Sequence, residues 1–174
     1  YAEGLASDYR QANSGGICGS ANGCTFIKCS NAGKISCDIT VSGWGYTGPG
    51  ALGGICGVGG TYILCSNSGE IIGGARIGGI SSRGTAIGCW NTGKVESTYR
   101  ENTNPGDTIN LAVVGVGGIL GDGTAENCYN KGYVTGTWIG IGGIVGNGVA
   151  NNCYNTGAVT STYNGSYAAA VGTI

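Results

Sequence analysis

Nine cysteines carry most of the chemistry available to this chain of 174 residues. Five of them recur in one phrase, Cys-x-Asn-x-Gly-x-(Ile/Val), which reads CSNAGKI, CSNSGEI, CWNTGKV, CYNKGYV and CYNTGAV. These five are Cys29, Cys65, Cys89, Cys128 and Cys153. A thiol can act as a nucleophile, bind a metal ion, form a disulfide or fill a core as a small apolar group.

The surrounding residues argue against catalytic and metal-binding thiols. The chain has no His, so a Cys-His or Ser-His nucleophile cannot form. It has no C-x-x-C pair, and thiols in a straight row do not make the tetrahedron that zinc prefers. We therefore predict no metal site and no cofactor, and we expect the five repeated cysteines to form a row of buried side chains.

The other four cysteines favour disulfides. Cys18 and Cys56 occupy equivalent places in two GGICG phrases, and Cys24 and Cys37 are both in the first repeat. Stacked strands would place Cα atoms about 4.8 Å apart, within the bridging range of about 4.4–6.8 Å. We predict the pairs Cys18–Cys56 and Cys24–Cys37, and the odd total leaves at least one thiol free or intermolecular.

The acidic residues give little basis for catalysis. Asp122 and Glu126 lie four apart in the loop-like segment GDGTAE. Paired carboxylates cleave glycosides in some β-helical enzymes, but solvated loop acids explain these two as well. The prediction is a protein without enzymatic activity.

Each Cys phrase follows a Gly-Gly-Ile phrase, and this recurrence predicts the fold. The units start near residues 15, 53, 78, 117 and 142, and an incomplete unit starts at 172. A recurring phrase at this spacing is typical of a parallel β-solenoid (β-helix), here with about five coils of three short strands. We expect residues 15–174 to form it, with corner insertions at 38–52 and 101–114. Residues 1–14 are predicted to be an N-terminal cap or a segment that pairs with another subunit.

The last complete unit illustrates the expected path of one coil. Strands are expected at 143–146, 150–154 and 158–163, with turns at Asn147-Gly148 and at Asn155-Thr156-Gly157. Glycine in the second turn is expected to supply a positive φ. Stacking should bring the corner asparagines into a ladder in which each amide bonds to the next coil. They are Asn31, Asn67, Asn91, Asn130 and Asn155.

Composition excludes several classes of protein. The net charge is −1 and only 10% of residues are charged, without a basic stripe, so nucleic acid is not an expected partner. No apolar run reaches the roughly 18 residues that a membrane-spanning helix needs. The chain begins at Tyr1 without a signal-like segment, which suggests a processed chain or an excised fragment.

Aromatic residues are candidates for a binding surface. Trp90, Tyr129 and Tyr154 each follow a ladder cysteine, while Trp138 and Tyr163 end third strands. An outward aromatic stripe would bind glycans or a neighbouring subunit, and ordinary stacking within the solenoid is the alternative. Asn164-Gly165-Ser166 fits either a glycosylation acceptor or a plain turn.

The phrases GGILG…NCYNKGYVTG and GGIVG…NCYNTGAVTS resemble GLUG-motif repeats, the Gly-Leu-x-Gly repeats of secreted and surface-anchored bacterial proteins. The similarity covers roughly residues 15–174, and Ser66, Ser81 and the inserts depart from it. Some members are parts of zinc peptidases, whose H-E-x-x-H motif requires His. The resemblance implies a non-catalytic repeat module that is extracellular or on the cell surface.

These observations support a leading hypothesis and three alternatives. The first is a structural protein that stacks head to tail into a filament or surface fibre, with copies of itself or other surface proteins as partners. The second is a non-catalytic adhesin or glycan-binding module. More distant are a polysaccharide-cleaving enzyme using Asp122 or Glu126, and an ice-binding protein using the Thr-x-Thr pairs at 135–137 and 160–162.

Overall fold

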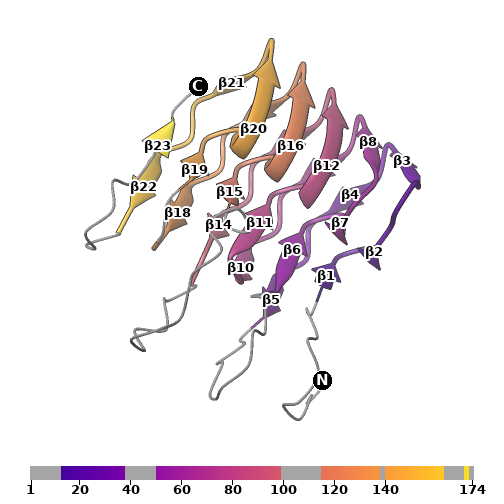
Figure 1. The fold of residues 1–174 in the computed structure, drawn as a ribbon, viewed down its shortest axis with the longest axis horizontal. Helices are drawn as coiled ribbons and strands as arrows, with labels where there is room; N and C mark the ends of the chain where they lie inside the picture. The colour runs from indigo at the N-terminus through magenta and orange to yellow at the C-terminus, as the bar shows by residue number, and fades with distance from the viewer. Residues whose placement is uncertain (1–12, 38–49, 99–114, 138–139, 163–170, 173–174) are drawn as a thin grey trace, which may run out of the picture.

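The computed structural model describes residues 13–37, 50–98, 115–137, 140–162 and 171–172. These residues contain strands and turns but no helix, and the strands stack in parallel to form a β-solenoid (Figure 1). No helix within this part of the chain is long and apolar enough to cross a membrane. The second predicted insertion and most of the first and of the N-terminal segment lie outside the described residues, as do Trp138, Tyr163 and Asn164.

Two of the four sheets flank the Gly-Gly corner. Sheet A consists, in spatial order, of β1 (Asn13–Gly15), β6 (Ala51–Gly53), β11 (Arg76–Gly78), β15 (Gly115–Gly117), β19 (Ile141–Gly142) and β23 (Val171–Gly172). Sheet B consists of β2 (Cys18–Ser20) with β3 (Thr25–Ile27), β7 (Cys56–Val58) with β8 (Thr61–Ile63), β12 (Ser81–Ile87), β16 (Leu120–Glu126) and β20 (Val145–Asn151).

The other two sheets flank the Asn-x-Gly turn. Sheet C consists of β4 (Ser30–Asn31), β9 (Ser66–Asn67), β13 (Trp90–Asn91), β17 (Tyr129–Asn130) and β21 (Tyr154–Asn155). Sheet D consists of β5 (Ile35–Cys37), β10 (Ile71–Gly73), β14 (Val95–Glu96), β18 (Val134–Gly136) and β22 (Val159–Ser161). Each coil therefore passes through sheets A, B, C and D in turn before the next coil begins.

The parallel solenoid is confirmed, but the division of a coil into three strands is wrong. A short strand of sheet A precedes each Gly-Gly corner, as β19 does in the last complete unit. The predicted turn at Asn147-Gly148 lies inside β20, where Gly148 is in register with Gly123 of β16. Gly148 has a φ of 142°, a conformation that glycine adopts readily, and the strand stays extended through it.

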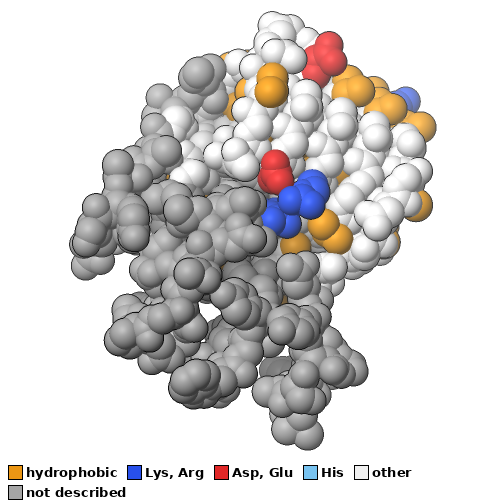
Figure 2. All heavy atoms as spheres, in the orientation of Figure 1, with side chains coloured by type: hydrophobic (Ala, Val, Ile, Leu, Met, Phe, Trp, Pro, Cys, Tyr) orange, Lys and Arg blue, Asp and Glu red, His pale blue; other side chains and the backbone are white. Residues whose placement is uncertain are grey.

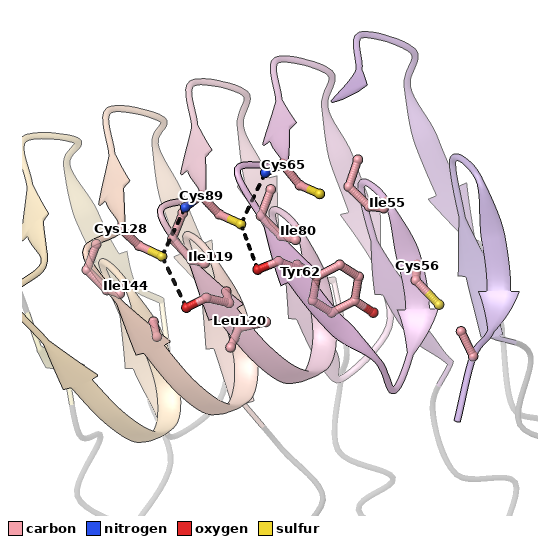
Figure 3. Packing of buried hydrophobic residues seen from close by; sticks show 13 residues of the cluster. Ile55, Cys56, Tyr62, Cys65, Ile80, Cys89, Ile119, Leu120, Cys128 and Ile144 are labelled. Atoms are coloured by element: carbon pink, nitrogen blue, oxygen red, sulfur yellow. Dashed lines mark hydrogen bonds between the residues drawn. The ribbon is translucent and has the colours of Figure 1, made fainter. Parts of the chain in front are cut away.

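The core is divided into two apolar clusters that run along the solenoid. The first contains the isoleucines of the last four Gly-Gly-Ile phrases together with Tyr62 and the central ladder cysteines (Figure 3). The second lies between sheets A and D and contains Leu52, Ile71 and Ile77 with their equivalents in the next coils. Burying one such aliphatic side chain contributes roughly 1.5–3 kcal/mol, so each coil depends on its neighbours to cover it.

The corner between sheets B and C is made by a left-handed residue just before each ladder cysteine. The five residues there are Lys28, Leu64, Gly88, Asn127 and Asn152, with φ of 55°, 54°, 63°, 53° and 49°. Glycine and asparagine adopt this conformation easily, whereas lysine and leucine do so at a cost. The sequence pattern did not reveal this corner because its residue type varies from coil to coil.

Replacing Leu64 with asparagine is expected to stabilise the protein by about 1 kcal/mol, because asparagine tolerates the left-handed conformation better than leucine. Leu64 is 44% exposed, which limits the apolar burial that asparagine gives up. The matched control is the reverse change, Asn127→Leu, which also removes the hydrogen bond from Asn152 to Asn127. Thermal unfolding should move in opposite directions for the two variants, and shifts of the same sign would contradict this account of the corner.

Candidate functional site: the asparagine ladder and its open ends

The Asn-x-Gly turn between sheets C and D is closed by the asparagine side chain. In the third coil, the amide Nδ2 of Asn91 donates to the carbonyl of Gly93 at 2.8 Å, and its Oδ1 accepts from the N–H of Gly93 at 3.2 Å. The first, fourth and fifth coils repeat both bonds. The asparagine therefore fixes the turn within its own coil and leaves one N–H of its amide free for another partner.

The remaining amide N–H makes the predicted ladder between coils. Nδ2 of Asn31 donates to Oδ1 of Asn67 at 2.8 Å, and the same bond at the same distance continues through Asn91 and Asn130 to Asn155. The three central asparagines are buried. All donors point from the N-terminal coil towards the C-terminal coil, so the ladder has a direction.

The glycine of this turn is needed for space and not for a positive φ, so that part of the expectation is wrong. Positive φ is found at other glycines, and Gly93 is not among them. A Cβ placed on Gly93 would lie 2.0 Å from the carbonyl oxygen of Gly69 in the preceding coil. Gly33 is different, because its nearest neighbour would be Oδ1 of Asn31 at 3.5 Å.

The three central cysteines of the ladder are buried, as predicted, whereas Cys29 and Cys153 at its ends are half-buried. The central thiols are hydrogen-bonded (Figure 3). The backbone N–H of Cys65 donates to Sγ of Cys89 at 3.3 Å, and Cys89 and Cys128 repeat this with the next coil. Sγ of Cys89 in turn donates to the carbonyl of Tyr62 at 3.4 Å. Hydrogen bonding with Cys128 and Cys65, together with burial, raises the pKa of Cys89, which disfavours the reactive thiolate.

The two predicted disulfides are not formed, because the structure has no disulfide at Cys18, Cys24 or Cys56. Cys18 and Cys56 are in register on β2 and β7, but each thiol donates to the carbonyl two residues further on, at 3.1 and 3.4 Å. Cys24 is exposed before β3, whereas Cys37 packs against the cluster between sheets A and D. The predicted Cys24–Cys37 disulfide does not form because the two residues, although close in sequence, lie at different sheets. The described residues contain no group of three or more potential metal ligands.

The predicted aromatic stripe exists on sheet C for three residues. The rings of Trp90 and Tyr129 stack at 6.1 Å between centroids, those of Tyr129 and Tyr154 at 5.2 Å, and Lys131 lies over Tyr129. Because the rings stack on one another, the middle ring has both faces covered. Flat ring faces are what a sugar packs against, so this arrangement favours ordinary stacking over a glycan platform.

The two acidic residues considered for catalysis lie on a strand and not in a loop. Both are on β16, where Asp122 forms an ion pair with Arg83 at 3.0 Å and Glu126 is in register with Asn151. Four residues of extended strand span about 13 Å at about 3.3 Å per residue. Glycosidases hold their carboxyl groups about 5–9.5 Å apart, so this pair does not fit that chemistry.

The two ends of the stack present complementary unpaired groups. Within sheet C, backbone N–H groups donate to the preceding coil: Ser66 to Cys29, Ser68 to Asn31, and Tyr154 to Cys128. In the described part of the chain, the first coil has no coil before it to accept from Ser30 and Ala32. Among the described residues, no strand of sheet C follows β21 to use the carbonyls of Cys153 and Asn155. There the ladder leaves one N–H on Asn155 and one acceptor site on Asn31.

No family model, curated protein or solved structure matches this chain.

Proposed function

We propose that this chain is a structural protein that assembles end to end into a filament by continuing its coil stack from one copy to the next. The direction of the asparagine ladder is the observation that carries the proposal. One end offers an amide N–H on Asn155, and the other offers an acceptor on Asn31. The same contact can repeat without closing on itself, which produces a filament and not a ring.

The joint would reuse the hydrogen bonds found within the chain. Asn155 of one copy donates to Asn31 of the next, as Asn130 donates to Asn155. The N–H groups of Ser30 and Ala32 then donate to the carbonyls of Cys153 and Asn155 of the first copy, as Tyr154 and Thr156 donate to their preceding coil. Each bond contributes about 0.5–1.5 kcal/mol, and open strand edges recruit further strands in this way.

Apolar burial and low charge also favour the joint. Ile17, at the first Gly-Gly-Ile corner, is 52% exposed, while its equivalents Ile55, Ile80 and Ile119 are fully buried. A coil stacked on this end would cover Ile17 as well. Charged side chains are sparse on the face shown in Figure 2, and only 10% of residues are charged, so like-charge repulsion between copies is weak.

An extracellular or cell-surface location is part of the proposal and rests on the resemblance to GLUG-motif repeats. Secreted fibre subunits are the setting in which end-to-end growth of such a module would serve a structural role. The glycan-binding alternative has less support, because the stacked rings of Trp90, Tyr129 and Tyr154 mainly present their edges.

Replacing Ala32 with proline should prevent assembly, because proline removes the N–H that the joint needs. That N–H has no acceptor within the described coils, so the fold should tolerate the change. The matched control is Ala32→Ser, since serine occupies the equivalent position, Ser68, in the second coil. Light scattering and electron microscopy should show filaments for the parent chain and Ala32→Ser, and monomers for Ala32→Pro. Folded Ala32→Pro chains that still form filaments would exclude this joint.

A further inference from the structure

Within the described residues, sheet A has one strand more than sheets C and D (Figure 1). This additional strand, β23, affects how a second copy can stack on the C-terminal coil. β23 lies on β19, with Val171 in register with Ile141, and the N–H of Gly143 donates to the carbonyl of Gly172 at 2.9 Å. Sheets B, C and D end one level earlier, at β20, β21 and β22. Among the described residues, β23 is therefore at a level of the stack where sheets B, C and D have no strand.

The N-terminal end has its own strand for that same level. β1 immediately precedes β2 across the Gly15–Gly16 corner, so β1, β2, β4 and β5 belong to one coil. If β2, β4 and β5 of a second copy stack on β20, β21 and β22, then β1 of that copy would have to occupy the position of β23. The two strands therefore compete for one position in sheet A.

β1 is the weaker of the two strands. Its middle residue, Ser14, is in register with Leu52, and that column continues through fully buried aliphatic residues: Ile77, Val116 and Ile141. A hydroxyl group therefore stands where the other coils have an aliphatic side chain. The neighbouring Asn13 has a buried Oδ1 without a hydrogen-bond partner. β23 brings a valine, Val171, to the equivalent register position.

We propose that β23 of one copy displaces β1 of the next copy at the joint. Until it is displaced, β1 occupies the position on β6 that the incoming β23 needs, and so it slows filament growth. The proposal rests on the end-to-end assembly described above, and the partner is a second copy of this chain. After the exchange, β23 pairs with β6 of its neighbour and Val171 comes into register with Leu52. The step exchanges hydrogen bonds and apolar contacts, and no covalent bond changes.

Two substitutions in the full chain test the exchange from both sides. Ser14→Val completes the aliphatic column and strengthens β1, so filament growth from preformed seeds should slow about tenfold. Val171→Ser weakens the incoming strand and should slow growth by a similar factor. The control is Ser68→Val, which makes the same change of residue type at an exposed position of the second coil, away from the joint. It should grow at the rate of the parent chain.

Amide hydrogen exchange on parent filaments supplies a second readout that does not depend on a variant. Protection at residues 13–15 should fall on assembly, and protection at 171–172 should rise. Growth that is unchanged or faster in Ser14→Val, or residues 13–15 that stay protected in the filament, would overturn the exchange and leave end-to-end assembly standing. If neither the parent chain nor any of these variants forms filaments, both proposals fall together.

Discussion

Replacing Gly93 with alanine is expected to lower the free energy of unfolding by about 3 kcal/mol or more. A Cβ at this position would lie 2.0 Å from the carbonyl oxygen of Gly69, which is backbone and cannot rotate away. The coils would have to separate locally, and the asparagine ladder and both core clusters depend on that separation. Urea unfolding of the purified protein measures the loss.

The chain provides a matched control in its first coil. Gly33 occupies the equivalent position, but an added Cβ would meet only Oδ1 of Asn31, at 3.5 Å, which is ordinary van der Waals contact. We expect Gly33→Ala to change the stability by less than about 1 kcal/mol. Equal losses in the two variants would show that glycine is required for its backbone conformation and not for the close approach of coils.

Replacing Asn91 with alanine is expected to cost about 3–5 kcal/mol, the second large effect. Asn91 is fully buried and serves four groups: the N–H and the carbonyl of Gly93, Nδ2 of Asn67 and Oδ1 of Asn130. Each buried polar group left without a partner costs about 1–3 kcal/mol, and partial relaxation reduces the sum.

The end of the ladder offers the comparison for Asn91→Ala. Asn155 makes the same turn but bonds to a neighbouring asparagine on one side only, and it is half-buried. Asn155→Ala should therefore cost about half as much. Chemical denaturation of the two variants gives the ratio, and equal costs would mean that the bonds between coils contribute nothing beyond the turn itself.

The sequence predicted the fold well because the residues that recur in the repeated phrase are those that contact the neighbouring coils. Asparagine at the turn and cysteine in the core recur because each meets its own equivalent one level away, as Asn67 meets Asn91. The Gly-Gly phrase recurs for the same reason. A Cβ on Gly54 would lie 2.3 Å from the carbonyl oxygen of Gly79, so the corner between sheets A and B admits no side chain there.

Features that are not encoded in a recurring residue type were missed. The left-handed corner is occupied by lysine, leucine, glycine and asparagine, so its backbone conformation recurs while its residue type does not. Strand division also failed, since Asn147-Gly148 has the composition of a turn but pairs with β16 as extended strand. The disulfide predictions failed because equivalent cysteines can share a register while their thiols bond to nearby carbonyls, as Cys18 and Cys56 do.

The candidate site was predicted in part. The asparagines of the ladder were identified from their spacing, but the direction of their bonds requires the placement of each amide, and that direction makes the two ends complementary. The Ser14 position was not recognised, because the first repeat retains Gly15-Gly16 while the residue before it changes from aliphatic to polar.

The helical rise of the assembled protein, measured by electron microscopy, tests the central claim most directly. Sheets C and D contribute five strands each, so a continued stack predicts a rise of about 24 Å per subunit and a repeat of about 4.8 Å along the axis. Filaments with these two spacings would support continuous stacking of coils across the joint. A chain that remains monomeric at high concentration, or filaments whose strands do not lie across the axis at this spacing, would contradict it.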